Sequence, residues 1–423
     1  MITLFYILFA FALFSLPLHR TMWLKPFVLL GVAVTLYLSL TATSVLLFES
    51  VLAFVLLALL LHEDDDITMT QILFIGAASF LLLQSESVLE YVIAFEAVSI
   101  ISVVLVAQIH TKEQAEGAVK MFMAAGLATG ILFLGLLFYT MGGGMLQEPV
   151  SSELNSFGVI GLAIMLAGIF YKLTIVPFHG WAADTYALVR SSHAAILSGV
   201  AKSVVALATF KIFSPYILNN LDAVVPVLVL LSVVTMTLGN FLALKQKRLS
   251  KILSYSSIAH AGYILLAFAA ISSTYATTGI LYMSIAYIFM QSAAFLALGT
   301  LQKHYGIETL DELKGFSVQN PLLAFFFSVQ LLSLAGIPLL AGFLAKAVVF
   351  YAGVDAGLWY VVLIALLNSA LSVGYYAWII KTIYFDAFKG KKSMYTQMIL
   401  PTFAQVILFG GTIYFGIFAG TVF

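Results

Sequence analysis

Apolar segments long enough to cross a lipid bilayer follow one another along almost the whole chain. The hydrocarbon core of a bilayer is about 30 Å thick, and a helix needs about 20 apolar residues to span it. The 423 residues are 62% hydrophobic and 9% charged, which leaves too few polar residues to cover a water-soluble protein of this size. A soluble enzyme and a disordered chain are therefore excluded, and the sequence predicts a polytopic membrane protein.

The apolar segments predict an all-α fold with about fourteen transmembrane helices. The strands of a membrane barrel alternate apolar and polar residues, whereas these segments are continuously apolar. The predicted spans lie near residues 1–18, 24–43, 45–62, 68–84, 87–108, 115–140, 157–180, 191–213, 223–244, 251–271, 275–303, 321–351, 357–384 and 396–422.

The distribution of basic residues orients these spans. Fifteen of the 19 Lys and Arg residues lie in or at the edges of odd-numbered loops, and Lys211 alone lies near an even-numbered loop. Loops rich in Lys and Arg stay in the cytoplasm. Both termini are therefore expected on the periplasmic or outer side of the membrane.

Several classes of cofactor and partner are not expected. The chain contains no cysteine, and iron–sulfur clusters and cysteine-based zinc sites need thiolate ligands. No metal-spaced histidine cluster and no nucleotide-binding loop occurs in the sequence, so we expect neither a metal nor a cofactor in this chain. A formal net charge of +0 argues against a nucleic-acid partner.

Three lysines and one clear carboxylate fall inside the predicted spans: Lys172, Lys202, Lys346 and Glu96. Glu49 and Glu90 lie nearer the outer ends of their spans and rank below Glu96. A charge at the bilayer centre costs about 2.5–3.5 kcal/mol on insertion scales. Lys172 and Lys202 lie too deep in their spans to reach the interface easily. Because burial disfavours the charged form of lysine and a nearby carboxylate favours it, such a set can exchange protons. The four residues therefore predict a proton or ion path, although buried ion pairs can also serve only to fix helix packing.

Proline and glycine interrupt two of the predicted spans. The seventh contains Pro177, and the twelfth contains Gly336, Pro338 and Gly342. Non-helical backbone at membrane depth is tolerated only where protein or a water-filled cavity covers it. Spans 4–8 and 9–13 form two blocks of five, each with its break in the fourth span, which predicts two inverted repeats. The expected organisation is three N-terminal helices (1–65), a first repeat (66–213), a second repeat (214–385) and a C-terminal helix (386–423).

Three further residues are weaker candidates for a proton path. His260 lies in the tenth span after a Ser- and Tyr-rich segment that includes Tyr255, and His179 lies beside the break in the seventh span. A lone histidine inside the membrane is as often a packing residue as a proton carrier. Both interpretations stay open for His179 and His260.

Four separated motifs resemble those of the antiporter-like membrane subunits of respiratory complex I, a family related to Mrp-type antiporter subunits and membrane-bound hydrogenases. The likeness covers about residues 66–385 and is greatest to the subunit N branch of the NADH–quinone oxidoreductases. The motifs are Lys172-x4-Pro177-Phe-His179-x-Trp181-x2-Asp184-x-Tyr186, the segment from Lys251 to Tyr263, Ser333-Leu-Ala-Gly-Ile-Pro338-x3-Gly342-Phe-x2-Lys346, and Asn368-Ser369 with Tyr375-Tyr376. The chain departs from the family between Trp181 and Arg190, where prolines are usual and none is present.

The resemblance implies a role for each buried charge. Glu96 and Lys172 would form the ion pair of one half-channel, Lys202 would be the central relay, and Lys346 would be its counterpart in the second half. The chain would be a subunit of a proton-translocating NADH:quinone oxidoreductase in the bacterial inner membrane, without redox chemistry of its own. Flavin and iron–sulfur clusters are expected in other membrane and peripheral subunits, and the complex would use the quinone pool.

Two alternatives remain at this point. The same core also occurs in subunits of Mrp-type cation/proton antiporters and of membrane-bound hydrogenases. A third possibility is a non-conducting structural subunit, in which the buried charges serve only to pack the helices.

Overall fold

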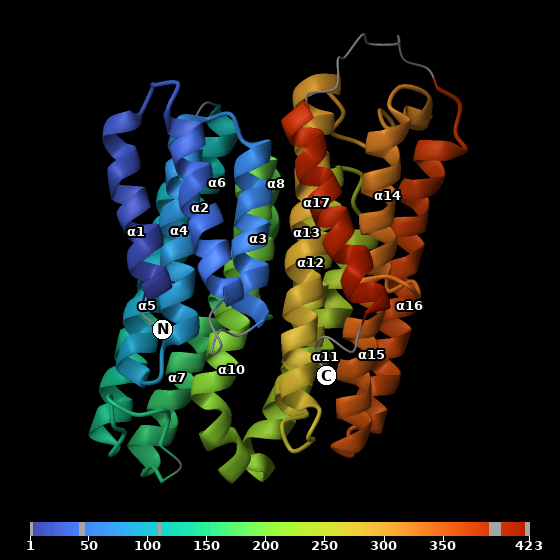
Figure 1. Cartoon of the computed structure of the whole chain (residues 1–423). Coiled ribbons are helices and arrows are strands. Elements are labelled where there is room, and N and C mark those ends of the chain that lie inside the picture. Colours follow the sequence, from blue (N-terminus) through green and yellow to red (C-terminus); the bar gives the residue numbers. More distant parts are fainter. Residues whose placement is uncertain (1–2, 42–46, 109–110, 152, 389–398, 419–423) are drawn as a thin grey trace.

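The computed structural model describes residues 3–41, 47–108, 111–151, 153–388 and 399–418, which form an upright bundle of helices (Figure 1). No strand occurs within these ranges, where the only β-pairing is an isolated bridge between Arg248 and Thr309. The all-α fold is therefore confirmed. Ten helices of the described residues are long and apolar enough to cross a membrane, and four shorter ones are also apolar.

Each of the fourteen predicted spans corresponds to one helix or to one interrupted helix. The two short 3-10 helices are η1 (Leu16–Leu18) and η3 (Phe316–Val318). The uninterrupted helices are α1 (Thr3–Ser15), α2 (Leu24–Thr41), α3 (Leu47–His62), α4 (Asp66–Gln84), α5 (Val88–Val106), α6 (Lys112–Met141), α11 (Leu221–Leu244), α12 (Leu249–Ala269), α13 (Ala276–Tyr305), α16 (Trp359–Tyr384) and α17 (Ile399–Ile417).

Three spans are interrupted, two of them where the sequence predicts a break. The seventh begins with α7 (Ser156–Leu173) and continues after the break as α8 (Gly180–Leu188), beyond its predicted end at residue 180. The twelfth consists of α14 (Pro321–Ala335) and α15 (Ala341–Asp355). The eighth was expected to be regular, but a π-helical turn, η2 (Ile196–Ala201), separates α9 (Ser191–Ala195) from α10 (Lys202–Asn219). The repeat boundaries at 66–213 and 214–385 stay predictions.

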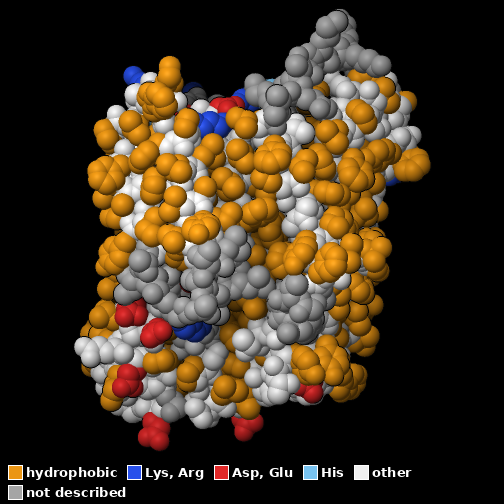
Figure 2. Space-filling model, in the orientation of Figure 1, with side chains coloured by type: hydrophobic (Ala, Val, Ile, Leu, Met, Phe, Trp, Pro, Cys, Tyr) orange, Lys and Arg blue, Asp and Glu red, His pale blue; other side chains and the backbone are white. Residues whose placement is uncertain are grey.

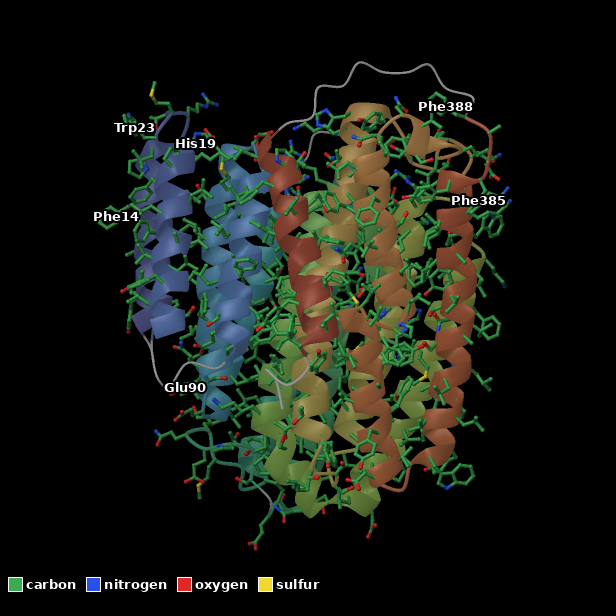
Figure 3. The ribbon with its side chains drawn as sticks, turned by 45° about the vertical axis from the view of Figure 1, so that its right-hand side comes forward. Phe14, His19, Trp23, Glu90, Phe385 and Phe388 are labelled. Atoms are coloured by element: carbon green, nitrogen blue, oxygen red, sulfur yellow. The ribbon has the colours of Figure 1, made fainter. Side chains whose placement is uncertain are left out.

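The surface of the bundle suits a lipid environment. Hydrophobic side chains cover the middle of the face shown in Figure 2, and most of its carboxylates lie near the lower end. Trp23 and Phe385, both exposed, project from the upper end of the bundle in Figure 3. Aromatic side chains are enriched at the interfaces between membrane and water.

Both predicted breaks begin at a residue with left-handed backbone. Thr174 follows α7 with φ 60°, and Gly336 follows α14 with φ 88°. Such a residue lets the chain leave a helix while its N–H still bonds the last carbonyl groups. At both sites the N–H of this residue donates to the last turn, and the chain then continues to the second half-helix.

Gly342 brings the two halves of the twelfth span into backbone contact. Its N–H donates to Ser333 Oγ at 3.1 Å, and a Cβ at this position would lie 1.9 Å from the Ser333 carbonyl oxygen. No side chain fits at that distance without moving α15 away from α14. The contact therefore fixes where Lys346, four residues further along α15, meets the end of α14.

We predict that Gly342→Ala destabilises the protein by about 1–3 kcal/mol, the usual cost of overpacking a tight contact. The measurement is the thermal unfolding midpoint of the purified complex in detergent. Gly126→Ala on α6 is the matched control, because a Cβ there would meet nothing within 4 Å. Equal midpoints for the two variants would show that the contact between α14 and α15 is looser than described.

Candidate functional site

Three lysine side chains lie inside the bundle, each next to an interruption of a helix. Lys172, Lys202 and Lys346 are only 5%, 0% and 3% exposed. Lys172 belongs to the last turn of α7, Lys202 is the first residue of α10 after the π turn, and Lys346 faces the end of α14. The structure thus places all three predicted lysines where regular helical hydrogen bonding stops.

Lys202 is bound entirely by uncharged oxygen atoms. Its Nζ donates to Thr174 Oγ1 at 2.9 Å, to Ser257 Oγ at 2.6 Å and to the Ser257 carbonyl at 3.1 Å. An ammonium group has three donors, so all of them are used. The rings of Tyr186 and Tyr287 lie 5.9 and 6.0 Å away, and no described carboxylate forms an ion pair with this lysine.

Lys346 is bound at the carboxyl end of the half-helix α14. Its Nζ donates to the carbonyl oxygens of Leu334 and Ala335, both at 3.0 Å, and to Ser369 Oγ at 3.1 Å. The last carbonyls of a helix lack intrahelical partners and carry the negative end of its dipole. The break therefore creates a site for a cation inside the membrane.

The neighbouring Asn368 has a separate role from Ser369. Its side chain accepts a hydrogen bond from Asn240 Nδ2 at 3.1 Å, and Tyr375 OH donates to Asn240 Oδ1 at 3.1 Å. These buried bonds join α16 to α11. They fix the face of α16 from which Ser369 reaches Lys346.

Glu96 and Lys172 do not form the direct ion pair that the resemblance implies. Lys172 Nζ instead donates to Ser102 Oγ at 2.8 Å, and Glu96 Oε2 accepts a bond from Thr129 Oγ1 at 3.0 Å. Ser102 follows Glu96 by six residues on α5, or about 9 Å along the helix axis. The two charges are near enough to attract each other, and the second carboxylate oxygen, Oε1, is buried without a partner.

Of the weaker candidates, His260 lies between Lys202 and Lys346, the two central lysines. Its ring packs against Tyr287 at 5.4 Å and Tyr263 at 5.8 Å between centroids, and these two tyrosines also face Lys202 and Lys346 respectively. His260 Nδ1 lies 2.8 Å from the Ser256 carbonyl, whereas Nε2 is buried without a partner.

Tyr255 and His179 lie apart from this group. Tyr255 is half-buried on α12 and takes no part in the hydrogen bonds that hold the central lysines. His179 precedes α8 in the break, and its Nδ1 is buried without a partner. The structure does not bring either side chain into contact with Lys202 or Lys346.

The sequence did not identify the oxygen atoms that bind the lysines. Ser102 and Thr174, like Thr129 beside Glu96, escaped notice because hydroxyl residues are common in membrane helices. Thr174 offered one signal, since it stands between Lys172 and Pro177 at the start of the break. Ser369 lay within a recognised motif, but nothing in the sequence linked it to Lys346.

A polar contact at one end of the bundle anchors the half-helix α8. Asp184 accepts a hydrogen bond from Lys120 of α6 at 2.7 Å and lies 3.6 Å from Lys251 of α12. This carboxylate, part of the first recognised motif, ties α8 to two long helices.

Comparison with known proteins is consistent with this geometry. Residues 85–372 match the family model described as NADH:quinone oxidoreductase/Mrp antiporter, TM. The chain is 32% identical to F(420)H(2) dehydrogenase subunit N of Methanosarcina mazei over 82% of its own length and 75% of that protein. It is 33% identical to NADH-quinone oxidoreductase subunit N of Rubrobacter xylanophilus over 75% of its own length and 67% of that protein.

Solved structures share the fold over almost the whole chain. A chain of respiratory complex I from Thermus thermophilus superimposes with a TM-score of 0.84 at 24% identity, covering 99% of this chain and 98% of that one. A chain of the Mrp complex from Dietzia sp. also gives a TM-score of 0.84, at 19% identity, covering 100% of this chain and 95% of that one. The resemblance inferred from the motifs is confirmed: the chain belongs to the membrane-spanning family of NADH:quinone oxidoreductase and Mrp antiporter subunits.

Proposed function

We propose that the chain is a proton-translocating membrane subunit of a quinone-reducing respiratory complex. The observation that carries this proposal is the set of three buried lysines, each bound by uncharged oxygen atoms beside a helix interruption. A lysine paired with a carboxylate is held in its charged form, whereas a lysine among neutral ligands can lose and regain a proton. Relatives named as NADH-quinone oxidoreductase subunit N support the same role.

The ligands of the two central lysines differ in a way that suits directional transfer. Thr174 and Ser257 bind Lys202 through hydroxyl groups, which can accept from an ammonium and also donate to a neutral amine. Lys202 meets one carbonyl in addition, whereas Lys346 meets two carbonyl oxygens, which can only accept, and one hydroxyl, that of Ser369. The site of Lys202 therefore accommodates the neutral amine better than that of Lys346, which favours the ammonium. A proton released by Lys202 is stabilised at Lys346.

We propose that water carries the proton between these lysines. Four side chains on or beside the path carry buried polar atoms without a protein partner: His260 Nε2, Tyr263 OH, Tyr376 OH and Gln291 Oε1. Buried polar groups without protein partners are commonly bonded by internal water. His260 stands between the lysines and is the side chain best placed to take part in the transfer.

Glu96 and Lys172 would couple this transfer to the rest of the complex. In the described state, hydroxyl groups hold the two charges apart. Closing the ion pair would move the Lys172 charge relative to Lys202 and change how readily Lys202 gives up its proton. Redox energy released elsewhere in the complex would drive that movement.

The proposal also sets the environment and partners of the chain. Its partners are the other membrane and peripheral subunits of the complex, together with the bilayer and the quinone pool. Those other subunits would hold the flavin and the iron–sulfur clusters. Relatives are named for F(420)H(2) as well as for NADH, so the electron donor is a property of those other subunits. We place the chain in the bacterial inner membrane with both termini on the periplasmic side.

We predict that Lys202→Ala and Glu96→Ala each lower the number of protons moved per quinone reduced. Lys202→Ala removes the central proton carrier, and Glu96→Ala removes the counter-charge of Lys172. The measurement is proton transfer into inverted membrane vesicles that contain the assembled complex. Lys303→Ala, which changes an exposed lysine, is the control. Full pumping by both variants with normal assembly would refute the relay and leave a structural role.

We predict that Thr174→Val also lowers pumping, to a level between those of the wild type and Lys202→Ala. Valine keeps the β-branched shape but removes one hydrogen bond to the ammonium, worth about 1.5–3 kcal/mol for a charged donor. Thr209→Val is the matched control, because Thr209 is equally buried but bonds Tyr91 instead of a lysine. Equal pumping by the two variants would exclude Thr174 from the site.

A further inference from the structure

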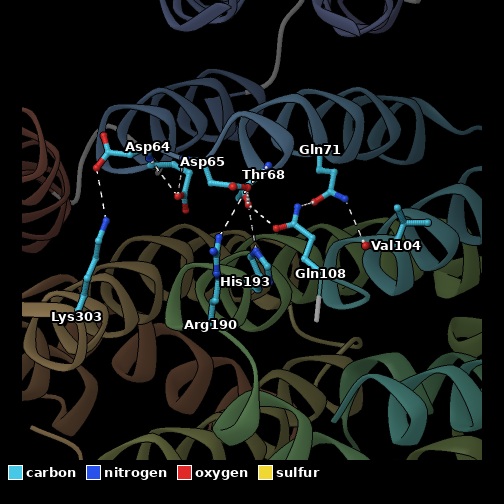
Figure 4. Close-up of polar contacts among 10 residues, drawn as sticks. Asp64, Asp65, Thr68, Gln71, Val104, Gln108, Arg190, His193 and Lys303 are labelled. Atoms are coloured by element: carbon cyan, nitrogen blue, oxygen red, sulfur yellow. Dashed lines mark hydrogen bonds and ion pairs between the residues drawn. The ribbon is translucent and has the colours of Figure 1, made fainter. Parts of the chain in front are cut away.

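A polar cluster joins the start of α4 to the start of α9 at the end of the bundle that we assign to the cytoplasm (Figure 4). Asp65 Oδ2 accepts hydrogen bonds from Thr68 N at 2.9 Å and from Thr68 Oγ1 at 2.7 Å. His193 Nε2 lies 3.2 Å from the same Thr68 hydroxyl. Asp65 is partly exposed, whereas His193 is only 1% exposed. The cluster thus leads from the surface into the bundle within three side chains.

The π turn changes how His193 is placed relative to Lys202. The two residues are nine positions apart, and nine residues of regular α-helix turn through about 900°, which puts them on opposite faces. A π turn accommodates one extra residue in the same rotation, so η2 reduces the offset to about 80°. The interruption therefore turns His193 and Lys202 toward the same side of the span.

Buried polar groups continue from this face toward Lys202. Ser198, within the π turn, donates to the Ala194 carbonyl at 2.6 Å and lies 3.5 Å from Gln291 Nε2. Gln291 follows Tyr287 by one turn of α13. The hydroxyl of Tyr287 donates to Ser257 Oγ at 2.8 Å, and Ser257 binds Lys202.

We propose that His193 is the proton-uptake residue of this chain: it takes protons from the cytoplasm through Asp65 and Thr68 and passes them along the η2 face to Lys202. This inference rests on the proposed function and adds the route by which protons reach Lys202 from the cytoplasm. An imidazole can bind a proton on one ring nitrogen and release another from the second, so it returns to its neutral form after each transfer. Water bonded to Ser198 and Gln291 would cover the remaining distance.

The charges around His193 suit such a role. Asp65 lies behind Thr68, and Arg190, which precedes α9, lies 3.7 Å from Asp65. On α13, Lys303 is engaged by Asp64 at 3.6 Å, and on α8, Asp184 is engaged by Lys120 and Lys251. Burial alone would raise the pKa of Asp65, but the bonds from Thr68 and the charge of Arg190 bring it below its usual value. At neutral pH the imidazole therefore lies near one anion that is itself balanced by one cation.

The test compares His193→Gln, Lys202→Ala and the double variant in inverted vesicles containing the assembled complex. Glutamine can still bond Thr68 but cannot carry a proton, so a merely structural histidine would be replaced without loss. We expect His193→Gln to lose as much pumping per quinone reduced as Lys202→Ala. The double variant should lose no more, because two steps in series do not add.

The pH profile and a control variant complete the test. We expect the pH dependence of the wild-type pumping rate to be altered in His193→Gln, because glutamine cannot bind or release a proton. His304→Gln, which alters a histidine in the last turn of α13, should behave as the wild type. If Lys202→Ala loses pumping while His193→Gln keeps both the wild-type rate and its pH profile, the uptake route is wrong and the relay stands. If Lys202→Ala pumps fully, both proposals fail together.

Discussion

The cost of placing an ammonium group in hydrocarbon governs the architecture of this protein. Each carbonyl within a regular helix already accepts a backbone hydrogen bond, so it offers a lysine only its second lone pair, as the Ser257 carbonyl of α12 does for Lys202. The chain meets this cost by interrupting helices and binding the lysines with the oxygen atoms that the interruptions release or position. Thr174 binds Lys202 from the end of α7, and the last carbonyls of α14 bind Lys346. Each of the two breaks therefore supplies ligands to one of the two central lysines.

This arrangement explains why the two halves of the chain are alike in plan but differ in chemistry. In the first half, the residue that ends the helix is a threonine whose side chain binds a lysine from another span. In the second half, Gly336 ends the helix, and the lysine on the continuation of the same span bonds the carbonyls before it. Gly342 enforces the second arrangement by bringing α15 against Ser333. One plan thus yields a site of two hydroxyls and one carbonyl in the first half and a site of two carbonyls and one hydroxyl in the second.

The spans, the buried charges and the breaks could be predicted from the sequence, because each involves a large free energy of transfer into the membrane. Apolar length marks the spans, charges within them mark Glu96, Lys172, Lys202 and Lys346, and Pro177 and Pro338 mark the breaks. The partners of those charges could not be predicted. Lys172 bonds Ser102 and not Glu96, which lies six residues earlier on the same helix, and no periodicity in the sequence distinguishes the two partners. The π turn before Lys202 could not be predicted either, since residues 196–201 contain no proline to mark it.

The uncharged ligands of the lysines leave a surplus of positive charge in the bundle. When all three amines and the Glu96 carboxyl are ionised, these four groups together carry two more positive charges than negative ones. A transmembrane voltage acts on such charges with about 2.3 kcal/mol for each elementary charge moved through 100 mV. An energised membrane would therefore oppose each outward transfer of a proton through this chain. The electrical gradient would act directly on the lysine side chains that carry the proton.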